Sequence, residues 1–121
     1  MFFILYNVTD KGETINRKLQ KIVKILKDKK GENVKILDLK KLTWITDYFV
    51  ILSGDSFVQN RAIAESILKE LDEKPVSVEG LENGKWVLID YRDIMIHIFL
   101  PETRAFYNLE KLWGDAGIIP I

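Results

Sequence analysis

The stretch Thr46-Asp47-Tyr48-Phe49-Val50-Ile51-Leu52-Ser53-Gly54 decides the fold of this chain. Its apolar run does not alternate with polar residues, so we expect a strand over residues 48–52 that is covered on both sides. The strand ends at Ser53-Gly54, and Ser56 and Gln59 then form a capping box at the start of a helix. A buried strand, a tight turn and a helix predict an α/β domain, and in enzymes this arrangement often marks a ligand site.

The rest of the chain extends this pattern outward. Hydrophobic spacing predicts helices over residues 10–29, 57–71 and 101–112, and strands over residues 34–39, 48–52, 76–81, 85–90 and 94–99. Asn83-Gly84 is the pair best suited to a type I′ turn between two of these strands. The lysines of the first helix, at positions 18, 21, 24 and 27, are expected to form a solvated face. We therefore predict one compact domain over residues 1–121, a mixed β-sheet flanked by helices, with residues 1–10 as an N-terminal arm.

Composition excludes several classes of function. The 121 residues carry 18 basic and 18 acidic side chains, so the whole molecule has no excess positive charge to attract nucleic acid. There is no cysteine and only one histidine, which argues against disulfides, a zinc site or a cysteine nucleophile. The apolar residues 2–6 are too few to span a bilayer. We expect a cytoplasmic protein without metal, cofactor, membrane contact or direct sequence-specific nucleic-acid binding.

The strand, tight turn and helix around Ser53-Gly54 are most typical of enzymes that catalyse nucleotidyl transfer. Such enzymes need two carboxylates one residue apart on a strand, shortly after a Gly-Ser or Gly-Gly turn, to hold a divalent metal. Here the turn is followed by a helix without such a pair, and Asp90 and Asp93 lie three apart, where turn roles are expected. His97, in an apolar strand with no nucleophile beside it, is expected to be structural. We predict no catalytic residues and no enzymatic activity.

Aromatic residues in the last third of the chain indicate a binding surface instead. In the strand over residues 94–99, Ile94, Ile96 and Ile98 point one way, and we expect them to face the helices. The alternate residues then face outward, where an apolar surface with aromatic and methionine side chains is typical of a protein-binding site. The predicted partner-binding residues are Trp86, Leu88, Asp90, Met95, His97, Phe99 and Tyr107.

Several runs of residues occur in the same order in one known family. These runs are Ile36-Leu37-Asp38-Leu39, Thr46 to Ile51 with Ser53-Gly54, Arg61-Ala62-Ile63-Ala64, Trp86-Val87-Leu88-Ile89-Asp90, His97-Ile98-Phe99, Phe106-Tyr107, Leu112-Trp113 and Asp115-Ala116. Over about residues 19–116 the chain resembles the ribosomal silencing factor family, also called Iojap-like proteins. It departs from many relatives at residues 56–60, where they have Ser-Arg-Gln or a similar run, and at Arg92, where they have glycine.

The resemblance implies a nucleotidyltransferase-like fold without the transferase site, and a factor that is not an enzyme. It implies binding to the large ribosomal subunit through universal large-subunit ribosomal protein fourteen. Such binding blocks joining with the small subunit and represses translation when nutrients are limiting. A homodimer of the free protein is a further expectation. The alternatives are a dimeric adaptor unrelated to ribosomes and a residual nucleotide-binding module at the Ser53-Gly54 turn.

Overall fold

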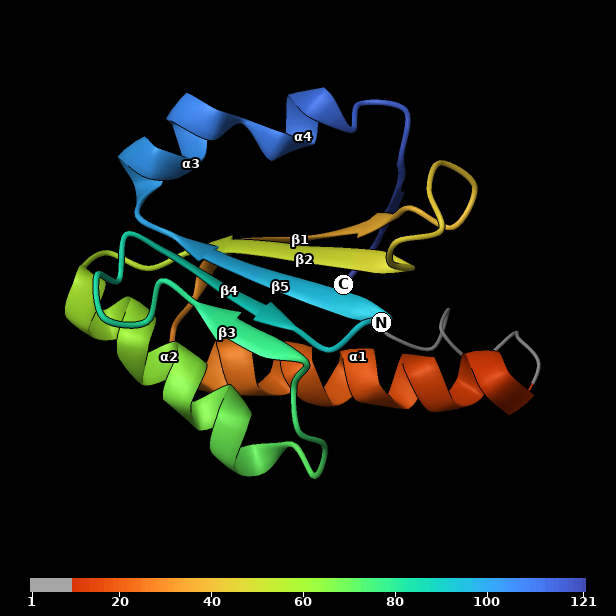
Figure 1. Cartoon of the computed structure of the whole chain (residues 1–121), viewed down its shortest axis with the longest axis horizontal. Coiled ribbons are helices and arrows are strands. Elements are labelled where there is room, and N and C mark those ends of the chain that lie inside the picture. The colour runs from red at the N-terminus through yellow and green to blue at the C-terminus, as the bar shows by residue number, and fades with distance from the viewer. Residues whose placement is uncertain (1–9) are drawn as a thin grey trace.

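The computed structural model describes residues 10–121, with side chains from residue 17 onward, so the expected N-terminal arm lies outside the described residues. The elements are α1 (Asp10–Asp28), β1 (Glu32–Asp38), β2 (Tyr48–Ser53), α2 (Phe57–Glu70), β3 (Ser77–Glu79), β4 (Trp86–Asp90), β5 (Ile94–Phe99), α3 (Pro101–Tyr107), α4 (Leu109–Leu112) and β6 (Gly117–Ile119). The strands form one sheet in the order β3-β4-β5-β2-β1-β6. Helices α1 and α2 lie on one side of the sheet, and α3 and α4 lie on the other (Figure 1).

Strand β2 occupies the interior of the sheet, as its uninterrupted apolar run predicted. All of its residues are buried. It pairs in parallel with β5, with Tyr48 opposite Ile94 and Ser53 opposite Phe99, and antiparallel with β1, with Val50 opposite Ile36. Parallel and antiparallel pairs in one sheet confirm the predicted mixed α/β domain.

The main core lies between the sheet and the first two helices. Ile94, Ile96 and Ile98 of β5 are fully buried in it, which confirms that this side of the strand faces the helices. Lys21, Lys24 and Lys27 are exposed, as expected. Lys18 is not part of a solvated face, because its Nζ lies 2.8 Å from Asp93 Oδ1 and 2.9 Å from a carboxylate oxygen of Glu73.

Of the two hydrogen bonds predicted for the capping box of α2, one forms and the other has a different donor. Ser56 Oγ accepts a hydrogen bond from the Gln59 amide at 3.0 Å. The return bond was predicted to reach the Ser56 amide, but Gln59 Oε1 accepts from the Asp55 amide at 2.7 Å. Gln59 Nε2 also donates to the carbonyl oxygens of Lys29 and Lys30, at 3.2 and 3.4 Å, and so ties α2 to the end of α1.

The connection between β3 and β4 differs from the predicted two-residue turn. The loop spans residues 80–85, and Gly80 and Gly84 adopt positive φ angles of 79° and 76°. Asn83 does not adopt a positive φ, which a type I′ turn would require of it. Instead, Asn83 Oδ1 accepts a hydrogen bond from the Lys85 amide at 3.1 Å, and this bond closes a longer loop.

The C-terminal region also differs from the single helix expected over residues 101–112. Asn108 has a left-handed φ of 46° and separates α3 from α4. Its side chain accepts from the Lys111 amide and caps the second helix. The chain then returns to the sheet as β6, which was not predicted and which pairs antiparallel with β1. The return places α3 and α4 across the outward side of the sheet (Figure 1).

Candidate functional site

The predicted binding residues of β4 and β5 do share one side of the sheet. Antiparallel pairing sets Trp86 opposite Phe99, Leu88 opposite His97 and Asp90 opposite Met95. We call these six residues the outward face. Tyr107, on α3, joins its rim, because its ring centroid lies 4.7 Å from that of Trp86.

A chain of ring contacts crosses this side of the sheet. The centroid distances are 5.1 Å from Phe106 to Tyr107, 4.7 Å from Tyr107 to Trp86, 6.0 Å from Trp86 to His97, 4.4 Å from His97 to Phe49 and 5.9 Å from Phe49 to Trp113. We call these six residues the aromatic ladder; Phe99 packs beside it, 4.9 Å from Trp86. Ring contacts at these distances stabilise beyond the area that they bury, so the ladder stiffens the outward face.

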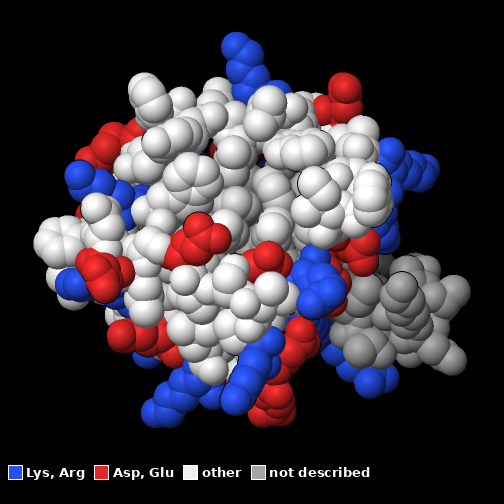
Figure 2. All heavy atoms as spheres, viewed as in Figure 1, with Lys and Arg blue, Asp and Glu red and all other residues white. Residues whose placement is uncertain are grey.

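Exposure along the ladder separates contact residues from supporting residues. Phe106 is 80% exposed and Tyr107 50% exposed, whereas Phe99 is fully buried and His97 is 4% exposed. Trp86, Leu88, Asp90 and Met95 are half-buried. In Figure 2 uncharged side chains dominate the region of α3 and α4, while charged side chains stand at its margin and also near the middle of the view. His97 and Phe99 were expected to face outward, but both are buried on the side that α3 and α4 cover. Trp86 and Met95 pack against the second core cluster and keep only part of their surface exposed.

His97 has the environment of a structural residue. Its Nδ1 accepts a hydrogen bond from Trp86 Nε1 at 3.1 Å, so the neutral ring carries its proton on Nε2. That Nε2 is buried and has no hydrogen-bond partner among the described residues. Burial lowers the pKa of His97 from 6.5 to about 4. The imidazole is neutral near pH 7, and it orients Trp86 rather than serving as a base.

The two aspartates of the β4–β5 connection hold a turn. Asp90 Oδ1 accepts from the Arg92 amide at 2.7 Å, and Asp93 pairs with Lys18. Arg92 itself has a positive φ of 77°. Among the described residues there is no group of three or more histidine, aspartate or glutamate side chains that could hold a metal ion. The described helices likewise include none that is long and apolar enough to cross a membrane.

The Ser53-Gly54 turn does not form an open phosphate cradle. The Gly54 amide donates to the Phe99 carbonyl at 3.0 Å, and the Asp55 amide is taken by Gln59. The side of Gly54 that a phosphate would approach is filled, since even a Cβ there would collide with Asn60 Oδ1. The alternative of a residual nucleotide-binding module at this turn therefore finds no support in the geometry.

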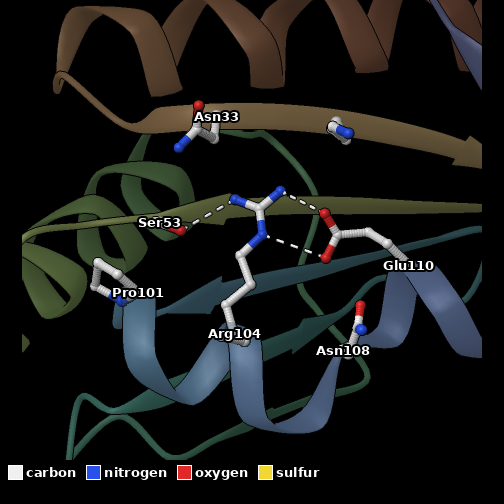
Figure 3. A pocket seen from close by; sticks show the side chains of 8 residues that line it. Asn33, Ser53, Pro101, Arg104, Asn108 and Glu110 are labelled. Carbon is white, nitrogen blue, oxygen red and sulfur yellow. Dashed lines mark hydrogen bonds and ion pairs between the residues drawn. The ribbon is translucent and has the colours of Figure 1, made fainter.

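A cavity of about 480 Å³ lies beside the same turn, on the α3–α4 side of the sheet. Figure 3 shows the Arg104 side chain rising from α3 between Ser53 and Glu110, with Asn33 projecting from β1 beyond the guanidinium. Arg104 Nε and Nη2 donate to the two carboxylate oxygens of Glu110 at 3.3 and 2.9 Å, and Nη1 donates to Ser53 Oγ at 3.0 Å. Sequence reasoning missed this Arg104 cavity, because its residues come from three separate regions of the chain.

Two further features were missed from the sequence, one on the surface and one in the core. Trp44 is 97% exposed and Ile45 69% exposed, in the loop between β1 and β2. A tryptophan between two strands gives no sequence signal that distinguishes a core residue from a surface residue. Phe49 joins the aromatic ladder only because β2 pairs with β5, far along the chain.

Comparisons with known proteins agree with this fold. The family model described as "Ribosomal silencing factor during starvation" matches residues 12–121. The chain is 42% identical to a ribosomal silencing factor of Halalkalibacterium halodurans over 106 residues, which cover 85% of this chain and 91% of the relative. It is 42% identical to that of Bacillus subtilis, over 75% of this chain and 80% of the relative. A crystal structure of a Chromobacterium violaceum protein superimposes with a TM-score of 0.79 and 37% identity, covering 88% and 90% of the two chains.

Proposed function

The chain belongs to the ribosomal silencing factor family, and on this premise we propose that it binds the large ribosomal subunit and blocks joining with the small subunit. The proposed contact is universal large-subunit ribosomal protein fourteen, and the proposed outcome is repression of translation when nutrients are limiting. The family match extends over residues 12–121, which supports extending the relatives' silencing role to this chain. Such a role requires a stable contact surface and enough bulk to exclude a subunit, and it requires no turnover.

The single observation that carries this assignment is the aromatic ladder beneath an accessible apolar surface. We place the contact at Trp86, Leu88, Met95 and Tyr107, with Asp90 as a polar position within it and Phe106 at its edge. Tryptophan and tyrosine are enriched among the residues that dominate binding energy. Asp90 offers a carboxylate for orientation, with its Oδ1 already fixed by the Arg92 amide.

Rigidity of the outward face supports the same role. Phe99 and His97 hold Trp86 from below, and the hydrogen bond from Trp86 Nε1 fixes the indole plane. A side chain that is ordered before binding loses little conformational freedom when the partner arrives. Little of the free energy gained from the contact is therefore lost in ordering these side chains.

Replacing Tyr107 or Met95 with alanine should weaken binding to isolated large subunits. A central interface side chain contributes about 2 kcal/mol, which corresponds to a roughly thirtyfold loss of affinity. Tyr107 is 50% exposed, so its replacement should cost little stability beyond its ring contacts with Trp86 and Phe106, about 1 kcal/mol in all. Cosedimentation of each variant with large subunits measures the affinity.

The matched control is Val58→Ala, because Val58 is 58% exposed on α2, on the opposite side of the sheet. It should bind like the unmodified protein. Normal binding by both Tyr107→Ala and Met95→Ala would move the contact away from the outward face.

We propose that silencing involves no catalysis. Asp90 and Asp93 are committed to the β4–β5 turn and to Lys18, rather than presented together on one strand. Magnesium-dependent turnover of a nucleoside triphosphate that Asp90→Asn abolishes would contradict this. We place the activity in the cytoplasm, by analogy with the bacterial relatives.

We also propose that the free protein forms a homodimer through apolar surface that the ribosome later covers. Phe106 and Leu112 are 80% and 72% exposed on the C-terminal helices, and they provide apolar surface that a second copy could cover. A two-fold contact would bury the same patch on both copies. A monomeric mass by light scattering at high concentration would count against it.

A further inference from the structure

The Arg104 cavity is a built polar site that silencing by the outward face does not use. Its lining combines side chains from β1, the end of β2 and the two C-terminal helices: Asn33, Lys35, Ser53, Pro101, Arg104, Ala105, Asn108 and Glu110. Its volume of about 480 Å³ falls within the range of small-molecule sites. It lies at the carboxyl end of β2, where open α/β sheets commonly bind ligands.

Arg104 retains unused donors although it is buried. A guanidinium has five N–H groups, and three donate to Glu110 and Ser53. The bidentate pair with Glu110 fixes the guanidinium plane, as Figure 3 shows. A buried ion pair often adds no more stability than an apolar pair of similar volume would, so stability alone does not account for this pair.

The charge of the lining favours an anion. Lys35 and Arg104 are cationic and Glu110 is anionic, which leaves a net charge of +1 among the lining residues. Lys35 is exposed, and within the described part of the chain it has no ion-pair partner. A small anion in the cavity can therefore approach both the Lys35 ammonium and the free N–H groups of Arg104.

The backbone of β1 aims a further donor at the same place. Pairing between β1 and β2 slips between Glu32 and Lys35, and Asn33 within this bulge has a left-handed φ of 52°. Bulges of this kind often turn a side chain toward a functional site. In Figure 3 the Asn33 side chain projects from β1 toward the space beyond Arg104.

We propose that the Arg104 cavity binds a small oxyanion, a carboxylate or a phosphate group. The Arg104 guanidinium and Lys35 provide the charge, and Asn33 and Ser53 provide neutral hydrogen bonds. Glu110 orients Arg104 and lowers the net positive charge of the lining to +1. The site is separate from the outward face and does not depend on ribosome binding.

Nuclear magnetic resonance of the full-length protein tests this site. Sodium phosphate and sodium acetate are titrated separately at constant ionic strength, with sodium chloride as the third arm. We expect saturating shifts of the Arg104 Nε–H resonance and of the Asn33 and Ser53 amides with phosphate, acetate or both. Saturation by one anion alone identifies that group as the ligand class.

Three variants make the test specific. Lys35→Met should weaken the anion roughly tenfold, because one charge-assisted contact is lost. Glu110→Gln should tighten it, because the lining then carries a net charge of +2, from two cations and no carboxylate. Lys69→Met, an exposed lysine on α2 across the sheet, should change nothing. Shifts that match sodium chloride, or equal affinity in Lys35→Met and the unmodified protein, would overturn the proposal.

Discussion

Replacing Phe99 with alanine should lower the free energy of unfolding by about 3–5 kcal/mol. Phe99 is fully buried at the end of β5, where it packs against Trp86 and in the second core cluster beneath α3 and α4. The truncation leaves a cavity that the sheet cannot close, because its neighbours are held by strand pairing on both sides. Urea unfolding followed by tryptophan fluorescence measures the change.

Phe106→Ala is the matched control for Phe99→Ala. Phe106 belongs to the aromatic ladder and Phe99 packs beside it, but Phe106 is 80% exposed whereas Phe99 is fully buried. Its replacement should alter the free energy of unfolding by less than about 0.5 kcal/mol. A similar loss of stability in the two variants would show that buried and exposed aromatic residues on this side of the sheet do not have separate structural and binding roles.

Acid should destabilise the protein through His97. The unfolded chain takes up a proton near pH 6.5, whereas the folded protein takes it up only near pH 4, because burial lowers the pKa of His97. Between these values the unfolded state binds more protons, so stability rises with pH. The contribution of His97 is complete above pH 6.5 and falls by about 3 kcal/mol as the pH drops to about 4.

Comparison with His97→Gln isolates this contribution from the carboxylates that titrate over the same range. The glutamine carbonyl can still accept the hydrogen bond of Trp86 Nε1, but it does not titrate. Urea unfolding at pH 7, 5 and 4 should show a shallower loss of stability in the variant. Equal losses in the two proteins would mean that the pKa of His97 in the folded protein stays near its unfolded value, and that burial does not lower it.

Features that depend on residues close together in the chain could be predicted from the sequence. The uninterrupted apolar run of β2 indicates burial on both sides by itself. Successive side chains of β5 point to opposite sides of the sheet, so Ile96 and His97 lie on different sides. Leu88 of β4 pairs with His97 and therefore lies on the same side as His97. The outward face was therefore accessible to sequence reasoning as a set of residues that share one side of a sheet.

Features that depend on distant pairing could not be predicted in this way. Phe49 reaches His97 only through the parallel contact of β2 with β5. Arg104 and Glu110 meet because Asn108 adopts a left-handed conformation between α3 and α4, and no proline or glycine marks that break. The exposure of Phe106 and the burial of Phe99 follow from the same placement of the C-terminal helices.

The conformation of Arg92 bears on a position where the family resemblance described from the sequence leads us to expect glycine in many relatives. Arg92 adopts a φ of 77°. Glycine reaches this conformation without steric cost, whereas a residue with a Cβ does not. The hydrogen bond from the Arg92 amide to Asp90 helps to hold the turn in this chain.

The yield of joined ribosomes tests the central claim most directly. Large and small subunits are mixed at a magnesium concentration that permits joining, with increasing amounts of the protein, and the products are separated on sucrose gradients. The unmodified protein and Val58→Ala should reduce the joined fraction, and a Met95→Ala and Tyr107→Ala double variant should largely restore it. An undiminished joined fraction at saturating unmodified protein would contradict the proposed function.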